Sequence, residues 1–178
     1  ITSLSGQDSS AELKRTTIIE AAESPKAAVT DPATIKAATD FVQKAAIGGM
    51  FEVESSKIAL DESANEEIKK FAQAMIDDHT KANEQLRATI DSSSVEKANV
   101  PTALDEKHVA VIEKLKTTKG ADFDKLYISE QKKAHNEAVT LFRIYAANGK
   151  DRALNKFAEK TLPTLEAHKK HVEGISIK

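Results

Sequence analysis

The chain has 178 residues, a formal net charge of −2 and no cysteine, and 40% of its residues are hydrophobic. This length is typical of one domain, or of one domain with an extension. The near-balance of charge argues against a nucleic-acid partner, which calls for a basic surface. The lack of cysteine excludes disulfide scaffolds, zinc ribbons and thiol nucleophiles. The longest apolar runs, near residues 45–51 and 139–147, are too short for a membrane-spanning segment.

Residues 1–30 differ in composition from the rest of the chain. They are rich in Ser, Thr and Ala with scattered charges, which predicts an extended arm or tether. This stretch lacks the charged and apolar regions of a signal peptide, so either the protein has no such signal or the signal has been removed. The expected division is therefore an arm at 1–30 and a helical domain at 31–178.

From Asp31 onward the sequence predicts helices. Asp31 is a good helix cap and Pro32 suits the first helical position. Apolar or small residues then recur in alternating steps of three and four, and no stretch alternates with the period of a strand. Long helices are expected at about 32–62, 64–90, 121–148 and 150–173, with a short helix between Pro101 and Gly120.

The fold class expected is all-α, a four-helix bundle. Tight turns pair the first helix with the second and the third long helix with the fourth. The segment 91–120 is far longer than a turn requires, and a helix of 28 residues is only about 42 Å long. The third long helix can therefore begin beside the start of the second. This is the ferritin-like topology, here with a short extra helix in the crossover connection.

Four side chains that carry metal-binding chemistry fall on or beside the expected core stripes: Glu52, His79, His135 and His168. Each comes from a different long helix. Counting about 1.5 Å per residue from the helix ends places His79 and His135 at one height. The same count places Glu52, Gln131 and His168 at another height. That height is about two helical turns nearer the connection between the first two long helices. A buried carboxylate such as Glu52 needs a partner, which could be a histidine, a lysine or a metal.

This set predicts a divalent transition metal in the bundle core, with Zn, Fe, Mn and Cu as candidates. A ferritin-like di-iron site requires a Glu-x-x-His pair on each of two helices. The residues three positions before His79, His135 and His168 are Ile76, Lys132 and Leu165, so di-iron oxidase chemistry is not expected. The alternative is a satisfied hydrogen-bond network without metal, in which Glu52 bonds His168 or a hydroxyl group.

The pairs Asp77-Asp78 and Gly48-Gly49 each allow two interpretations. Asp77 and Asp78 are either solvated acids or, for Asp78, a carboxylate that orients a neighbouring side chain. The pair Gly48-Gly49 costs about 1 kcal/mol per residue in a helix relative to alanine. We expect the pair to allow close approach of another helix, with contact to a ligand as the alternative.

Several segments resemble one bacterial family. They are the Gly-Gly-Met-Phe-Glu-Val-Glu run at 48–54, Asp77-Asp-His-Thr-Lys-Ala-Asn83, Phe123-Asp-Lys-Leu-Tyr127, Gln131-Lys-Lys-Ala-His135, and Pro163 followed by His168. Together they are similar, over about residues 37–173, to a domain-of-unknown-function family labelled predicted outer-membrane proteins and assigned to the ferritin-like bundles. The resemblance implies a periplasmic, secreted or outer-membrane-associated protein, and it brings no established activity.

The function expected from the sequence is that of a cell-envelope bundle protein that binds a metal or a small polar ligand in its core. The arm at 1–30 would provide envelope association, and self-association into a homo-oligomer is a further expectation. The alternatives are a purely structural or interaction bundle and a metal-dependent oxidoreductase. The sequence contains no motif specific to an enzyme, so a non-catalytic protein is favoured and an enzyme remains an alternative.

Overall fold

The computed structural model describes residues 31–178, and the predicted arm at 1–30 lies outside the described residues. The helices are α1 (Pro32–Glu62), α2 (Glu66–Ile90), the 3-10 helix η2 (Lys97–Asn99), α3 (Glu106–Thr117), α4 (Gly120–Asn148) and α5 (Arg152–Glu173). No strand occurs between residues 31 and 178. The all-helical prediction and the positions of the four long helices are confirmed.

Side-chain caps set the starts of α1, α2, α3 and α5. Asp31 accepts a hydrogen bond from the Thr34 amide, and Asn65 accepts bonds from the first turn of α2. Asp105 and Asp151 play the same part for α3 and α5. These carboxylate and amide oxygens satisfy backbone amides that have no partner inside the helix. The short crossover helix is confirmed, although it begins at Glu106 rather than at Pro101 and ends at Thr117, before Gly120.

Gly120 is the first residue of α4 rather than a stop signal for α3. Its φ is +60°, a left-handed conformation that favours glycine. The chain therefore turns sharply between α3 and α4 with only two residues between the helices. This tight connection directs α4 back along the bundle beside α1.

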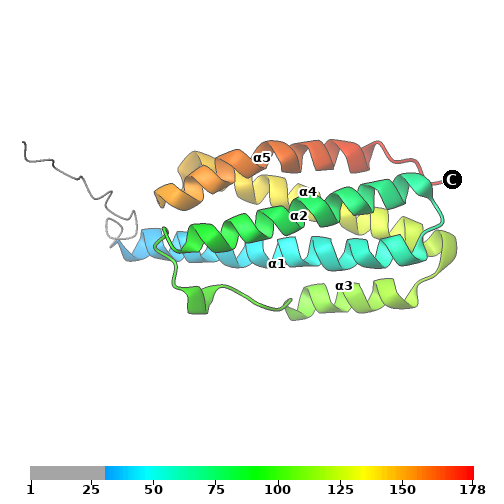
Figure 1. Cartoon of the computed structure of the whole chain (residues 1–178), viewed down its shortest axis with the longest axis horizontal. Helices are drawn as coiled ribbons and strands as arrows, with labels where there is room; N and C mark the ends of the chain where they lie inside the picture. The colour runs from blue at the N-terminus through cyan, green and yellow to red at the C-terminus, as the bar shows by residue number, and fades with distance from the viewer. Residues whose placement is uncertain (1–30) are drawn as a thin grey trace, which may run out of the picture.

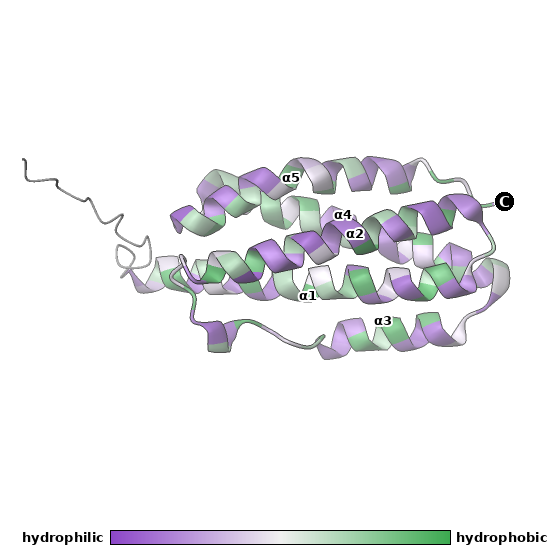
Figure 2. Cartoon of the chain, in the orientation of Figure 1, coloured by the Kyte–Doolittle hydropathy of each residue, from purple (hydrophilic) through white to green (hydrophobic). Residues whose placement is uncertain are grey.

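The long connection after α2 has the expected crossover topology. Figure 1 shows α2 and α4 beginning at the same end of the bundle, with the intervening segment and α3 running back along the outside of α1. The four long helices thus enclose the core and α3 covers part of one side. Figure 2 shows hydrophilic and apolar residues interspersed along each helix, as expected for helices with one face in a core. Within residues 31–178 no helix has the length and apolar character needed to cross a membrane.

The buried apolar residues form two clusters at opposite ends of the bundle. One contains Phe41, Leu86 and Phe142, and the other contains Phe71, Met75 and Phe123. In α2, α4 and α5, buried polar side chains lie between the segments that form these clusters, and in α1 they lie between Phe51 and Ala59 of the second cluster. The members of this polar layer are Glu52, Ser55, Ser56, His79, Gln131, His135 and His168. A polar layer across a helical core needs internal partners, because burial removes its contacts with water.

Candidate metal centre

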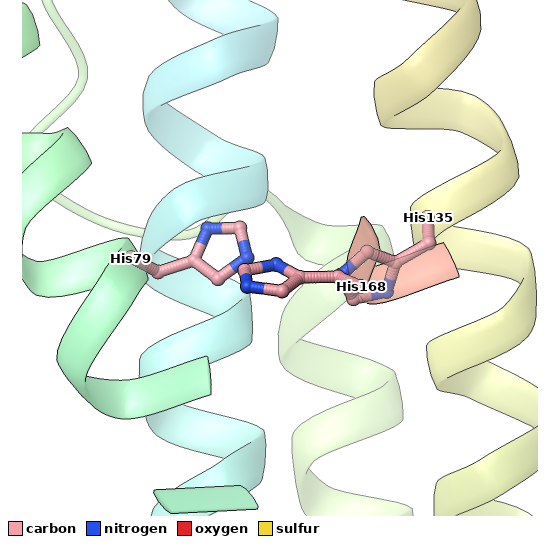
Figure 3. A group of neighbouring side chains, drawn as sticks. All are labelled: His79, His135 and His168. Atoms are coloured by element: carbon pink, nitrogen blue, oxygen red, sulfur yellow. The ribbon is translucent and has the colours of Figure 1, made fainter. Parts of the chain in front are cut away.

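Three histidines meet inside the polar layer. His79 comes from α2, His135 from α4 and His168 from α5, and Figure 3 shows their rings directed toward one another. The ring centroid of His79 is 5.9 Å from that of His135 and 5.3 Å from that of His168. The centroids of His135 and His168 are 5.6 Å apart. One ligand nitrogen from each ring lies within 4.8 Å of the other two. We call these residues the histidine group.

The predicted height of two of these residues is confirmed and that of the third is wrong. His79 and His135 lie at one level, as counting from the helix ends predicts. His168 joins them rather than lying about two turns away. The count treats the helix ends as level, whereas α5 ends before the end of the α1–α2 pair and residues 175–178 continue beyond it (Figure 1). That stagger moves His168 deeper into the bundle.

Hydrogen bonds fix which nitrogen of His135 and of His168 faces the group. Nδ1 of His135 is 2.9 Å from the backbone oxygen of Gln131, and Nε2 of His168 is 2.7 Å from Oδ2 of Asp78. A carbonyl or carboxylate oxygen only accepts, so each of these nitrogens carries the proton. Each neutral ring therefore turns a bare lone pair inward, on Nε2 of His135 and on Nδ1 of His168.

The inward nitrogens have no hydrogen-bond partner among residues 31–178. They are Nε2 of His79, Nε2 of His135 and Nδ1 of His168, and all three are buried. The three residues are only 6%, 1% and 6% exposed. Burial lowers the pKa of His79 well below its usual value and that of His135 to about 4, and it also lowers the pKa of His168. All three rings are therefore neutral near pH 7, the protonation state in which imidazole binds metals.

Asp78 orients His168, as the second of the two sequence readings expects. Its carboxylate bonds the ring nitrogen that faces away from the group. Gln131 acts similarly on His135 through its backbone oxygen. Carboxylate or carbonyl partners on the outer nitrogen are the usual support for metal-binding histidines, because they set the tautomer and the direction of the ring.

Glu52 lies beside the histidine group and not within it. Its Oε1 is 4.0 Å from Nδ1 of His135, the nitrogen that faces away from the other two rings. It bonds neither His168, which pairs with Asp78, nor a hydroxyl group. Burial raises the pKa of Glu52 to about 8, while the Gln131 side chain favours the ionised form. Its Oε2 is buried and has no hydrogen-bond partner in the part of the chain that the structure describes.

Outside the histidine group, polar side chains of this layer form hydrogen bonds with one another. Ser56 Oγ is 2.8 Å from the Tyr127 hydroxyl, and the Gln131 side-chain amide donates to Ser55 Oγ over 3.1 Å. These pairs join α1 to α4 between the histidine group and the apolar cluster that contains Phe71. The unpaired atoms of the layer are thus concentrated at Glu52, Gln131 and the three histidines.

A cavity of about 720 Å³ lies against the histidine group. Its lining includes His79, His135 and Glu52 together with apolar residues of all four long helices. The spacing of residues along the helices does not predict this cavity. A signal for it exists in the small residues at or beside core positions, namely Ala45, Gly48, Gly49, Ala82, Ala134 and Ala138.

The two glycines have different surroundings. A Cβ atom at Gly49 would overlap the side chain of Asn83 on α2, so the expected close approach of a neighbouring helix is confirmed there. A Cβ atom at Gly48 would meet nothing within 4 Å, so close approach does not explain this residue. Gly48 instead lines the cavity.

Comparisons with known proteins identify the fold and the family. A protein described as "putative secreted protein DUF305" from Streptomyces coelicolor superposes with a TM-score of 0.60 at 16% identity, covering 76% of this chain and 88% of that one. A DUF305 fragment from Deinococcus radiodurans gives a TM-score of 0.62 at 13% identity, covering 81% and 95%. No curated protein matches the chain. The model of the family described as "Domain of unknown function (DUF4142)" matches residues 22–175, and this chain therefore belongs to that family.

Proposed function

We propose that the protein binds one divalent transition metal ion in the core of the bundle, through Nε2 of His79, Nε2 of His135 and Nδ1 of His168. The observation that carries the proposal is the convergence of three buried, unpaired ring nitrogens within 4.8 Å of one another. Lone pairs that face one another in an apolar interior are costly unless a cation or a donor lies between them. Protonation of a ring is disfavoured by burial.

The ligand set favours particular metals. Three neutral imidazoles suit zinc and copper better than manganese, which prefers oxygen ligands. Three protein ligands also leave a fourth position of a tetrahedral zinc ion available, as in catalytic zinc sites. In this proposal Glu52 lies 4.0 Å from the outer nitrogen of His135 and is not itself a ligand. The set of four ligand residues expected from the sequence is therefore narrowed to three. We expect affinity in the order Cu, Zn, Fe, Mn.

We further propose that the protein acts outside the cytoplasm, in the periplasm or as a secreted protein. The support is the description of the Streptomyces structural neighbour as a "putative secreted protein". Outer-membrane association through the arm, membership of the ferritin-like group and formation of a homo-oligomer remain predictions from the sequence. Fractionation of cells that express the complete gene tests the location, and recovery with cytoplasmic proteins alone would contradict it.

The metal proposal is tested on untagged protein purified without chelator. Elemental mass spectrometry before and after loading with Zn²⁺, Cu²⁺, Fe²⁺ or Mn²⁺ is expected to give one bound ion per chain. The informative variant is His168→Gln, and His171→Gln is its matched control, because His171 lies on the same helix outside the histidine group. Circular dichroism of both metal-free variants establishes that each is folded.

We expect His168→Gln to weaken metal binding strongly and His171→Gln to leave it unchanged. A wild-type protein that takes up none of the four metals would refute the proposal and favour the structural network. Equal loss in both variants would also refute it, because the ion would then bind elsewhere.

A further inference from the structure

The cavity beside the histidine group lies within the bundle. All four long helices line it, and the start of α3 contributes Lys107 and His108. Its volume of about 720 Å³ is in the range of pockets that hold small organic molecules. From His135 to Ile144 on α4, both of which line the cavity, the helix rises about 13 Å at 1.5 Å per residue.

The cavity walls are apolar and are built from residue types of contrasting size. Phe51, Phe142 and Phe157 border it, while small residues at several other lining positions leave the space open, namely Ala45, Gly48, Gly49, Ala82, Ala134 and Ala138. Gly48 is the most informative residue, because its missing side chain faces open space inside a helix that glycine weakens. A large apolar space of this kind is poorly suited to water, which needs several polar partners.

The buried and the exposed parts of the cavity lining differ chemically. In the buried part, Glu52 Oε2, His79 Nε2 and His135 Nε2 have no hydrogen-bond partner among residues 31–178. Among the other lining residues are Lys107 and Glu137, which form an exposed ion pair with an N–O distance of 3.8 Å, and Ile144, which is 58% exposed. Access from solvent is therefore along the side lined by the start of α3 and by α4 from Glu137 to Ile144.

We propose that this cavity binds a monocarboxylic acid with an unbranched apolar tail, with the tail among the phenylalanines and the carboxyl group at the histidine end. The proposal rests on the metal site proposed above and names its ligand. Three imidazoles bring no negative charge to a divalent ion, so an anionic oxygen is the ligand expected in the open position. The apolar walls select a ligand whose remaining atoms are hydrocarbon.

The test is calorimetric titration of zinc-loaded protein with butanoate, hexanoate and octanoate. Burial of each added methylene is expected to lower Kd about fourfold, so octanoate binds about two orders of magnitude more tightly than butanoate. Gly48→Leu places a side chain in the cavity and is expected to remove this gain. Glu54→Leu, an exposed position of the same helix, is the matched control and is expected to retain it. Zinc content is measured for every variant.

A second measurement locates the carboxyl group. In cobalt-loaded protein, octanoate is expected to change the visible absorption of the ion, because the ligand in its open position changes. Unchanged absorption during saturable octanoate binding would overturn the placement of the carboxyl group on the metal.

The outcomes separate this inference from the metal proposal. Zinc-loaded protein that binds no octanoate, or that binds it equally after Gly48→Leu, overturns the inference and leaves the metal site standing. Protein that takes up no metal but binds octanoate in a manner abolished by Gly48→Leu refutes the metal site and supports the cavity as the ligand site.

Discussion

The metal-free protein is expected to be most stable near pH 6.5 and to lose stability on both sides. On the alkaline side the cause is Glu52. Burial raises its pKa from an ordinary 4.5 to about 8, so between these values the native state holds a proton that the unfolded chain has released. Stability therefore falls as pH rises through this window, by about 1.4 kcal/mol per pH unit for one proton. From pH 6.5 to 8 Glu52 alone lowers the free energy of unfolding by about 1.7 kcal/mol. The unfolded chain also loses its remaining histidine protons over this range, which offsets part of the fall, so the net fall is about 0.5 to 1 kcal/mol.

On the acid side the cause is the histidine group. Burial lowers the pKa of His135 from 6.5 to about 4 and that of His79 well below 6.5. As pH falls below 6.5, the unfolded chain binds protons that the native rings do not bind, which destabilises the native state. The destabilisation from His79 and His135 is larger than the opposing stabilisation from the proton on Glu52. The lowered pKa of His168 increases the destabilisation further. The net loss between pH 6.5 and 5 is about 1 kcal/mol per unit or more.

The assay is urea unfolding in the presence of EDTA, followed by circular dichroism between pH 5 and 8.5. Glu52→Gln keeps a neutral polar side chain at this position and is expected to abolish the fall above pH 6.5 while leaving the acid side in place. Glu54→Gln, an exposed change on the same helix, is the control. The reasoning is wrong if the wild-type free energy of unfolding stays level or rises from pH 6.5 to 8, or if Glu52→Gln loses stability there as the wild type does.

Two further predictions concern Asp78 and Asp151, which form hydrogen bonds with buried groups. Asp78→Asn is expected to weaken metal binding 10- to 100-fold in a competition titration with a chelator, because it weakens the support of a ligand histidine, whereas Asp77→Asn has no such effect. Asp151→Ala removes bonds of 2.6 and 2.7 Å from the Ser94 amide and hydroxyl as well as the α5 cap, and is expected to cost about 3 kcal/mol in urea unfolding. A cost no larger than that of Asp31→Ala, an exposed cap, would contradict the role of this buried carboxylate.

Much of the fold follows from local chemistry that can be read along the chain. Asp31 and Pro32 mark the start of α1, the spacing of apolar residues indicates the long helices, and the length of segment 91–120 predicts the crossover. The common level of His79 and His135 follows from the same reasoning, because helical rise per residue is constant. These features depend on one helix at a time, or on the length of one connection.

The composition of the site depends on how the helices are staggered and rotated against one another. Counting along α5 does not place His168 in the histidine group, because the helix ends before its neighbours do. Nor does periodicity show that Glu52 lies on the outer side of His135, since a residue on a core stripe can still point past its neighbours.

By itself, the sequence determined the helices, their order and the candidate ligands, since caps, periodicity and connection length are properties of neighbouring residues. The tertiary structure alone decided that three nitrogens converge without partners, that Asp78 orients His168, and that Gly48 lines a cavity. The physical reason is that stagger and rotation are set by packing of side chains from four helices at once, and packing of that kind leaves no periodic trace in one chain.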